Sequence, residues 1–313
     1  MTSGAAPRSS TPAYPKPMRY ALLALVLASK LTAADLIVPP LTEGAPQPGK
    51  RATVITAEYV GTKVHHLIAL PDDWTPDWKA RGKHWPVIAE YTGNYYPGSG
   101  STGQAEGAAL GYGLTRGKAI WVILPYVAKD HHQNEITWWG DIDATVSYAK
   151  TNIPRICNEF GGDAKKVILC GFSRGAIGVS FLGLHDDEVA KLWCGLWAHD
   201  HFDGATEWKG TDWGSPLARY RQEAAVRLKR LQGRPLLVTQ GSGAATVRPL
   251  LAAQLSAPSW TYADVDMQAL YGKFPNESVK HPHNDRWLLR DCPQTNAARD
   301  WFERVTASDK PSK

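Results

Sequence analysis

The 313-residue sequence lacks any run of 18 apolar residues, so it has no obvious membrane span. It also lacks internal repeats, and no linker-like stretch follows residue 50, which favours a single domain over residues 35–313. Hydrophobic residues make up 43% of the chain, enough to build a substantial core. This composition argues against global disorder.

Cysteine is scarce, with four residues and no CxxC pair, which argues against a zinc site. Cys170 and Cys194 lie in apolar runs typical of strands, and we interpret both as buried thiols. Cys157 and Cys292 remain as a candidate disulfide, should the protein be exported.

Residues 1–34 predict a leader with a signal peptide. Arg19 precedes the apolar segment Ala21–Ala28, and small residues at 32–34 offer a cleavage site before Asp35. We therefore expect a secreted or periplasmic protein. The alternative reading of this segment is a buried helix.

An excess of positive charge is also absent from the predicted mature chain. The full sequence has a net charge of +5, but residues 1–34 hold four basic residues and no acidic one. Residues 35–313 therefore have a net charge of only +1, and we predict no nucleic-acid partner.

The remaining chain alternates between strand-like and helix-like segments after an initial hairpin. Strands are expected within 52–60, 63–70, 84–92, 119–124, 167–170, 192–200 and 234–240. Helices are expected within 103–116, 137–160 with an irregularity near Pro154, 176–188, 216–232 and 285–306. This order predicts an α/β protein whose open, mostly parallel sheet carries helices on both faces.

A serine stands between two glycines in the segment VILCGFSRGA, at residues 167–176. Four apolar residues lead into Gly171, and a helix-compatible segment follows Gly175. A sharp strand-to-helix turn of this kind exposes a serine hydroxyl above the sheet, and the glycines avoid clashes. We predict that Ser173 is a nucleophile rather than part of an ordinary turn.

The leading hairpin, the alternating elements, the G-F-S-R-G turn and a late histidine together resemble the α/β-hydrolase superfamily. The resemblance covers roughly residues 50–308. It implies a serine nucleophile, an acid and then a histidine along the chain. It leaves the substrate open, because this fold hosts many activities.

The resemblance places the general base in a loop after the last strand, where the sequence reads VKHPHNDRWLLRD. His283 is the first choice, because the last helix begins shortly after it. His281 is second, because Pro282 restricts it to an extended conformation.

The acid is missing from its commonest position in the superfamily, after the strand 234–240. Alanine stands at 244, and no Asp or Glu occurs from Ala224 to Ala263. Some members carry the acid after the preceding strand instead. The candidates in order of preference are Asp203, Asp200, and then Asp264 or Asp266.

The oxyanion hole implied by the resemblance needs two main-chain N–H groups. The first is assigned to Arg174, which follows the nucleophile at a helix N-terminus. The second is assigned to Asn94, with Gly93 or Tyr95 as neighbours, in the loop EYTGNYYPGSGSTG.

Tryptophan is abundant, with 13 residues. Trp138 and Trp139 lie where substrate loops gather in this fold, so they are candidates for a sugar or aromatic platform as well as for the core. The preceding Asp-His-His segment, residues 130–132, lacks metal-ligand spacing and is interpreted as a loop or helix start.

Taken together, these residues predict an exported serine hydrolase of carboxylic esters, small or polymeric, that needs neither a metal nor an organic cofactor. Plant polysaccharide or polymer esters are one expectation. A serine peptidase and a non-catalytic binding protein on the same fold remain as alternatives.

Overall fold

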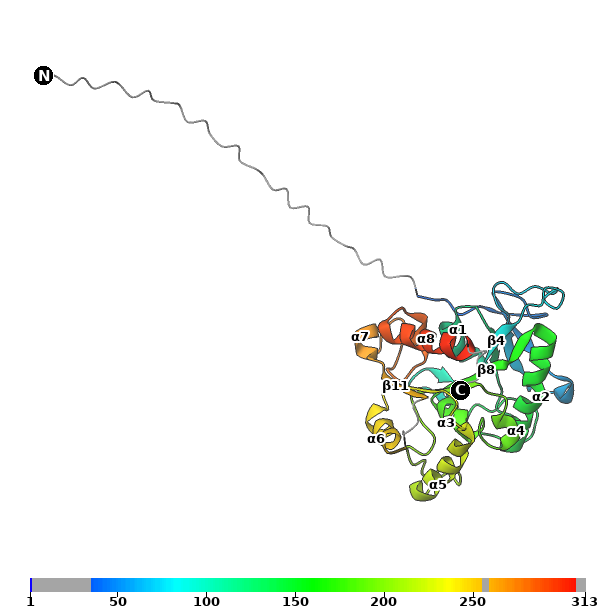
Figure 1. Ribbon diagram of the computed structural model, residues 1–313. Helices are drawn as coiled ribbons and strands as arrows, with labels where there is room; N and C mark the ends of the chain where they lie inside the picture. The colour runs from blue at the N-terminus through cyan, green and yellow to red at the C-terminus, as the bar shows by residue number, and fades with distance from the viewer. Residues whose placement is uncertain (2–34, 255–258, 308–313) are drawn as a thin grey trace. The chain divides into compact units, whose positions relative to one another are not determined.

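The structure is a computed structural model that describes Met1 and residues 35–254 and 259–307 (Figure 1). The predicted leader and signal peptide lie outside the described residues. Among the described residues, no helix is long and apolar enough to cross a membrane.

A nine-stranded sheet organises the described residues, in the order β1-β2-β3-β7-β4-β8-β9-β10-β11. β3 is antiparallel to β2 and β7, and every other neighbouring pair is parallel. The strands are β1 (Leu41–Thr42), β2 (Arg51–Val54), β3 (His66–Ala69), β4 (Trp85–Tyr91), β7 (Ile120–Ile123), β8 (Gly162–Phe172), β9 (Gly195–His199), β10 (Leu236–Gln240) and β11 (Trp260–Asp264). A separate hairpin joins β5 (Tyr95–Tyr96) and β6 (Ser101–Thr102). The predicted mostly parallel sheet is confirmed.

Helices cover both faces of this sheet, as expected (Figure 1). One face carries α2 (Ile142–Phe160), α3 (Arg174–Phe181), α4 (Asp187–Ala190), α5 (Leu217–Leu228) and α6 (Ala244–Gln254). The other face carries α1 (Leu110–Thr115), α7 (Met267–Tyr271) and α8 (Pro293–Ala307).

The central strands are buried on both faces because their apolar residues alternate between two cores. In β8, Val167 and Leu169 pack under α2 and α3, whereas Ile168 and Cys170 pack toward α1 and α8. Unbroken apolar runs are typical of such doubly covered parallel strands. Strand β8 is therefore held between two cores up to Phe172, the residue before Ser173.

Several elements differ from their predicted bounds. The expected hairpin around Gly61 contains a 3-10 turn at Ala57–Tyr59, and its strands β2 and β3 are correspondingly shorter. Helix α2 continues through Pro154 without interruption, because its buried face remains packed on the sheet. Strand β11 was not predicted, since its sequence WTYAD lacks an apolar run.

Candidate active site

Ser173 stands at the sharp turn between β8 and α3, with φ 56° and ψ −116°. Non-glycine residues seldom adopt such angles, and they occur where surrounding structure enforces them. A Cβ on Gly171 would lie 2.2 Å from the Gly175 carbonyl oxygen, and one on Gly175 would lie 1.9 Å from that of Tyr91. Close approach of the backbone therefore requires both flanking glycines.

Ser173 is less open than the sequence suggested. Only 8% of the residue is exposed, so neighbouring residues cover most of its surface. The side chain opens instead into a small hollow that it shares with Asn94, Trp138 and Trp208. The serine is thus reached through a pocket rather than from an open surface.

His283 brings the loop between α7 and α8 to Ser173. The hydroxyl Oγ of Ser173 lies 2.8 Å from Nε2 of His283, so the hydroxyl can donate a hydrogen bond to the ring. His281 does not contact the serine, and its Nδ1 accepts the main-chain N–H of His283 at 3.0 Å. The His283 ring also lies 4.7 Å from that of Phe172. These contacts position the imidazole that the sequence favoured.

Asp200 supplies the carboxylate on the other side of the ring. Nδ1 of His283 donates to its Oδ2 at 2.6 Å, and the main-chain N–H groups of Gly241 and Ser242 donate to Oδ1 at 2.9 and 2.7 Å. Burial of Asp200 opposes ionisation. The His283 hydrogen bond, the nearby His199 and the Ser242 N–H nevertheless hold the pKa of Asp200 well below its usual range. Asp200 is therefore ionised beside the ring.

The prediction that Asp203 is the acid is wrong. Its buried carboxylate accepts hydrogen bonds from Arg227 at 2.8 and 3.0 Å and from Ser180 at 3.1 Å. The turn at Gly204, with φ 77°, leads the chain toward α5. Asp203 therefore ties the segment after β9 to α3 and α5 and does not contact His283.

The remaining acid candidates also lie away from the imidazole. Asp264 pairs with Arg248, and Asp266 accepts the N–H of Ala269 as the N-cap of α7. Asp200 was ranked second, although it directly follows the last residue of β9. Position was the available signal, because residues at the carboxyl ends of parallel strands face the crevice where ligands bind.

The loop after β10 has a different role from the one expected of it. It contains no acid, but its residues Gly241, Ser242 and Gly243 all donate main-chain N–H groups to Asp200. The Ser242 hydroxyl adds a hydrogen bond to Oδ2 at 2.9 Å. The loop thereby holds the carboxylate that the preceding strand provides.

The two predicted oxyanion donors border the hollow that contains Ser173. Within the described part of the chain, the main-chain N–H groups of Arg174 and Asn94 have no hydrogen-bond acceptor. The N–H of Tyr95, by contrast, donates to Ile136 and is already used. The assignment of Arg174 and Asn94 stays a prediction, and Tyr95 is removed as an alternative.

The Arg174 side chain connects the segments around this hollow. Its guanidinium is buried and lies 3.7 Å from the centre of the Tyr126 ring. It donates to the carbonyl oxygens of Trp138 at 2.7 Å, Gly93 at 3.0 Å and Gly103 at 3.2 Å. One planar cation therefore fixes three main-chain segments beside the predicted oxyanion loop.

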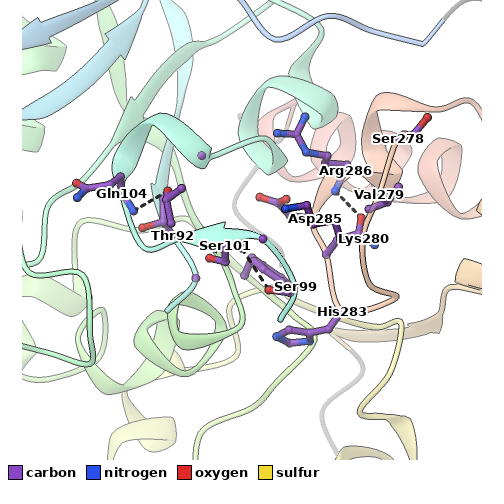
Figure 2. A pocket seen from close by; sticks show the side chains of 16 residues that line it. Thr92, Ser99, Ser101, Gln104, Ser278, Val279, Lys280, His283, Asp285 and Arg286 are labelled. Atoms are coloured by element: carbon purple, nitrogen blue, oxygen red, sulfur yellow. Dashed lines mark hydrogen bonds between the residues drawn. The ribbon is translucent and has the colours of Figure 1, made fainter. Parts of the chain in front are cut away.

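Two hollows adjoin the serine and histidine. A polar one of about 280 Å³ includes Thr92, Ser101 and Gln104 on one side and Asp285 on the other, with His283 below in the view of Figure 2. The second, of about 240 Å³, contains Ser173 itself and is mainly aromatic. Its aromatic residues are Tyr95, Tyr96, Trp138, His201 and Trp208.

The structure also places the cysteines and the Asp-His-His segment. All four cysteines are free, and Cys157 and Cys292 lie in cores on opposite faces of the sheet, so the candidate disulfide is wrong. His131 contacts Asp141 at 2.8 Å at the start of α2. No cluster of three or more potential metal ligands occurs among the described residues.

Comparison with known proteins supports the fold assignment. No family model matches the chain, and no curated protein matches it. A solved mutant of esterase Est22 is 15% identical with a TM-score of 0.50, over 83% of this chain and 80% of that one. A ferulic acid esterase is 12% identical with a TM-score of 0.49, over 82% of this chain and 97% of that one.

A mutant feruloyl esterase module from Clostridium thermocellum, solved with sinapinate, is 10% identical with a TM-score of 0.49, over 90% of this chain and 98% of that one. At such low identities a structural likeness shows the fold alone. With the strand order and the turn at Ser173, the likeness to the Est22 mutant shows that the chain has the α/β-hydrolase fold.

Proposed function

We propose that this protein is a serine hydrolase that cleaves carboxylic esters. One observation carries the proposal: Ser173 Oγ is 2.8 Å from His283 Nε2, and His283 Nδ1 is 2.6 Å from Asp200. The ring can accept the serine proton at Nε2 while Asp200 holds the Nδ1 tautomer and stabilises the imidazolium. This arrangement has the chemistry of a nucleophile activated by a base.

In the first step, Ser173 Oγ attacks the acyl carbon and its proton passes to His283 Nε2. The resulting oxyanion is stabilised by the N–H groups of Arg174 and Asn94. The bond from the acyl carbon to the alcohol oxygen then breaks, and His283 donates its proton to that oxygen. The products of this step are the free alcohol and an acyl group on Ser173.

In the second step, water attacks the acyl carbon and gives one proton to His283. The bond between the carbon and Ser173 Oγ breaks, and the same proton returns to Ser173. The carboxylic acid leaves and the resting state is restored. Neither step needs an oxidant or reductant.

The nucleophile assignment is tested with a fluorophosphonate probe, which forms a covalent adduct with an activated serine. The wild-type protein should be labelled, Ser173→Ala should not, and the control Ser180→Ala should be labelled like the wild type. Ser180 is a buried serine of helix α3, which begins directly after Ser173, and it does not line the hollow that contains Ser173. An unlabelled wild-type protein would contradict the proposal and support a binding protein.

The leaving group is tested with paired substrates. We expect Ser173-dependent hydrolysis of 4-nitrophenyl acetate and at least tenfold weaker cleavage of peptide anilides. Preferential cleavage of the anilides would instead support a peptidase.

We also propose that the protein is exported, on the basis of Arg19, the apolar segment Ala21–Ala28 and the small residues before Asp35. Mass spectrometry of protein from the native host should place the mature N-terminus near Asp35. An intact leader on cytosolic protein would contradict export.

A further inference from the structure

A continuous series of ring contacts leads away from His283. The His201 ring lies 5.0 Å from that of His283 and 5.2 Å from that of Trp208. The centre of the Trp138 ring lies 4.9 Å from that of Trp208 and 5.0 Å from that of Trp213. Trp138, Trp208 and Trp213 are each half-buried, so they retain exposed surface. The aromatic walls of the catalytic hollow therefore extend well beyond Ser173.

Trp138 lines two hollows at once. It borders the hollow of about 240 Å³ that contains Ser173, and also an open one of about 780 Å³. The larger volume is typical of sites that bind drug-sized ligands, and the smaller one is below that range. The larger hollow, which we call the tryptophan hollow, therefore lies beside the one in which a bound ester would meet Ser173. Its lining includes Lys129, Asp130, Gln133, Glu135, Trp138, Trp139, Asp212 and Trp213.

The tryptophan hollow combines aromatic surface with unused hydrogen-bonding capacity. Lys129, Gln133 and Asp212 are exposed, and their side chains have no hydrogen bond or ion pair with other described residues. These groups would lose hydrogen bonds to water under an aliphatic acyl chain. A ligand that offers both C–H faces and many hydroxyl groups matches the two kinds of surface.

The charges around this hollow also argue against an anionic ligand. Asp130, Glu135 and Asp212 supply three carboxylates against the one ammonium of Lys129. An anionic polymer would be repelled by this balance. A neutral saccharide satisfies the donors and acceptors without adding charge, and its ring can pack on tryptophan.

The backbone of Trp138 is held in place from the catalytic side. Its φ of 53° is unusual for a bulky residue, and such strain persists where the surroundings enforce it. The Trp138 N–H donates to Asn94 Oδ1 at 2.7 Å, and its carbonyl accepts from Arg174 at 2.7 Å. The platform and the predicted oxyanion loop are therefore a single hydrogen-bonded unit.

We propose that the tryptophan hollow is a saccharide subsite, and that the substrate is an ester carried by a neutral oligosaccharide. The inference rests on the proposed ester hydrolysis at Ser173 and adds the class of alcohol that the enzyme uses. Trp138 and Trp213 would contact sugar rings, while Gln133 and Asp212 would bind hydroxyl groups.

The kinetic test keeps the acyl group constant and changes the alcohol. We compare kcat/KM for O-acetylated xylo-, cello- and manno-tetraose with kcat/KM for 4-nitrophenyl acetate. In Trp213→Ala and Gln133→Ala, the saccharide-to-nitrophenyl ratio for the preferred tetraose should fall about tenfold or more, mainly through KM. Trp74→Phe, which alters a half-buried tryptophan packed on Phe160, should leave the ratio unchanged. An unchanged ratio in both hollow variants would overturn the subsite.

Trp213 also packs on Trp139 and Phe181, so its removal can weaken folding. Gln133→Ala changes only an exposed side chain and keeps the test valid if Trp213→Ala does not fold. Circular dichroism melting establishes which variants are folded before rates are compared.

A binding test separates this inference from the proposed function. Ser173→Ala protein is titrated with unmodified xylo-, cello- and manno-tetraose, and tryptophan fluorescence is followed. At least one tetraose should bind, and adding Gln133→Ala should weaken that binding. If binding is seen but the wild type hydrolyses no ester, the proposed function fails and the saccharide site stands. If esters are hydrolysed but no tetraose binds, the saccharide subsite is refuted. It is refuted as well if a quaternary ammonium ligand, a cation that the three carboxylates would attract, binds in place of any tetraose.

Discussion

Asp200 and His283 lie 83 residues apart in the chain, and Asp200 Oδ2 accepts a 2.6 Å hydrogen bond from His283 Nδ1. The other carboxylate oxygen accepts main-chain N–H groups from the loop after β10. A proton held on Nδ1 leaves the lone pair of Nε2 directed at Ser173. The hydrogen bond thus links the end of β9 to the histidine loop in the orientation that proton transfer from Ser173 requires.

The first prediction concerns this carboxylate. Asp200→Asn should lower kcat for 4-nitrophenyl acetate by about 10⁴, the scale seen for the equivalent change in a serine protease triad. The fold should persist, because the asparagine oxygen can still accept the N–H groups of Gly241 and Ser242. Steady-state kinetics and a melting curve measure the two effects.

Asp203→Asn is the matched control, three residues along the chain. It removes one partner of the buried ion pair with Arg227, so the free energy of unfolding should fall by about 3–5 kcal/mol. The folded fraction should keep kcat within a few-fold of the wild type. The reverse pattern, with turnover dependent on Asp203 and not on Asp200, would contradict the assignment.

The second prediction concerns the turn at Ser173. The added methyl group of Gly175→Ala would stand 1.9 Å from the Tyr91 carbonyl oxygen, a main-chain atom that cannot easily move. We expect the free energy of unfolding to fall by about 3 kcal/mol or more, together with loss of ester hydrolysis. Urea unfolding and nitrophenyl ester rates measure these losses.

Gly178→Ala is the control on the same helix. Its nearest new contact would be an ordinary 3.5 Å to Trp139, and alanine is the better helix former. Stability should stay equal or rise by up to about 1 kcal/mol. Equal destabilisation by both alanines would show that the helix tolerates no added methyl group. The close approach to Tyr91 would then not be the cause of the stability lost in Gly175→Ala.

The third prediction concerns the guanidinium of Arg174. Arg174→Lys keeps the charge and the main-chain N–H but loses the planar donors to Gly93, Gly103 and Trp138. Displacement of the oxyanion loop should lower kcat about 10²-fold with little change in KM. Affinity for a boronic acid transition-state analogue should fall in parallel.

Arg221→Lys is the control, because Arg221 also donates to main-chain carbonyls but lies away from Ser173. Its kcat and KM should match the wild type. If Arg174→Lys lowers only the melting temperature, Arg174 has a structural role and does not position the loop.

The fourth prediction concerns pH. Burial, with a smaller effect from Asp285, raises the pKa of Glu90 from 4.5 to about 7. A carboxyl group with a raised pKa in the folded state binds its proton more tightly there than in the unfolded chain. The contribution of this carboxyl group to the free energy of unfolding is complete below about pH 4.5 and declines as the pH rises to about 7.

Glu90→Gln should remove the part of the pH-dependent decline in the free energy of unfolding that comes from Glu90. The Gln side chain can still accept from Gly111 N–H and the Trp121 indole, both 2.8 Å from Oε2 in the wild type. The stability deficit of the variant, measured by urea unfolding, should therefore be smaller at pH 8 than at pH 5. A deficit that does not change with pH would mean that the pKa of Glu90 is not raised.

The sequence alone indicated the alternating elements, the mostly parallel sheet and the turn at Ser173. These features could be predicted because their causes are local. An unbroken apolar run buries a strand on both faces, and glycines beside a serine permit a turn that other residues would block. His283 could be proposed because the α/β-hydrolase fold implies a histidine in the loop after the last strand.

The choice between Asp200 and Asp203 depended on tertiary structure. Both follow β9 and both are buried, and although Asp200 stands directly at the strand end, that position alone does not show which carboxylate meets His283. The direction of each carboxylate is set by distant partners: the N–H groups after β10 and His283 for Asp200, and Arg227 on α5 for Asp203. Because a buried charge is stable only where its counterpart and donors are assembled, only the folded chain decided which aspartate faces the histidine.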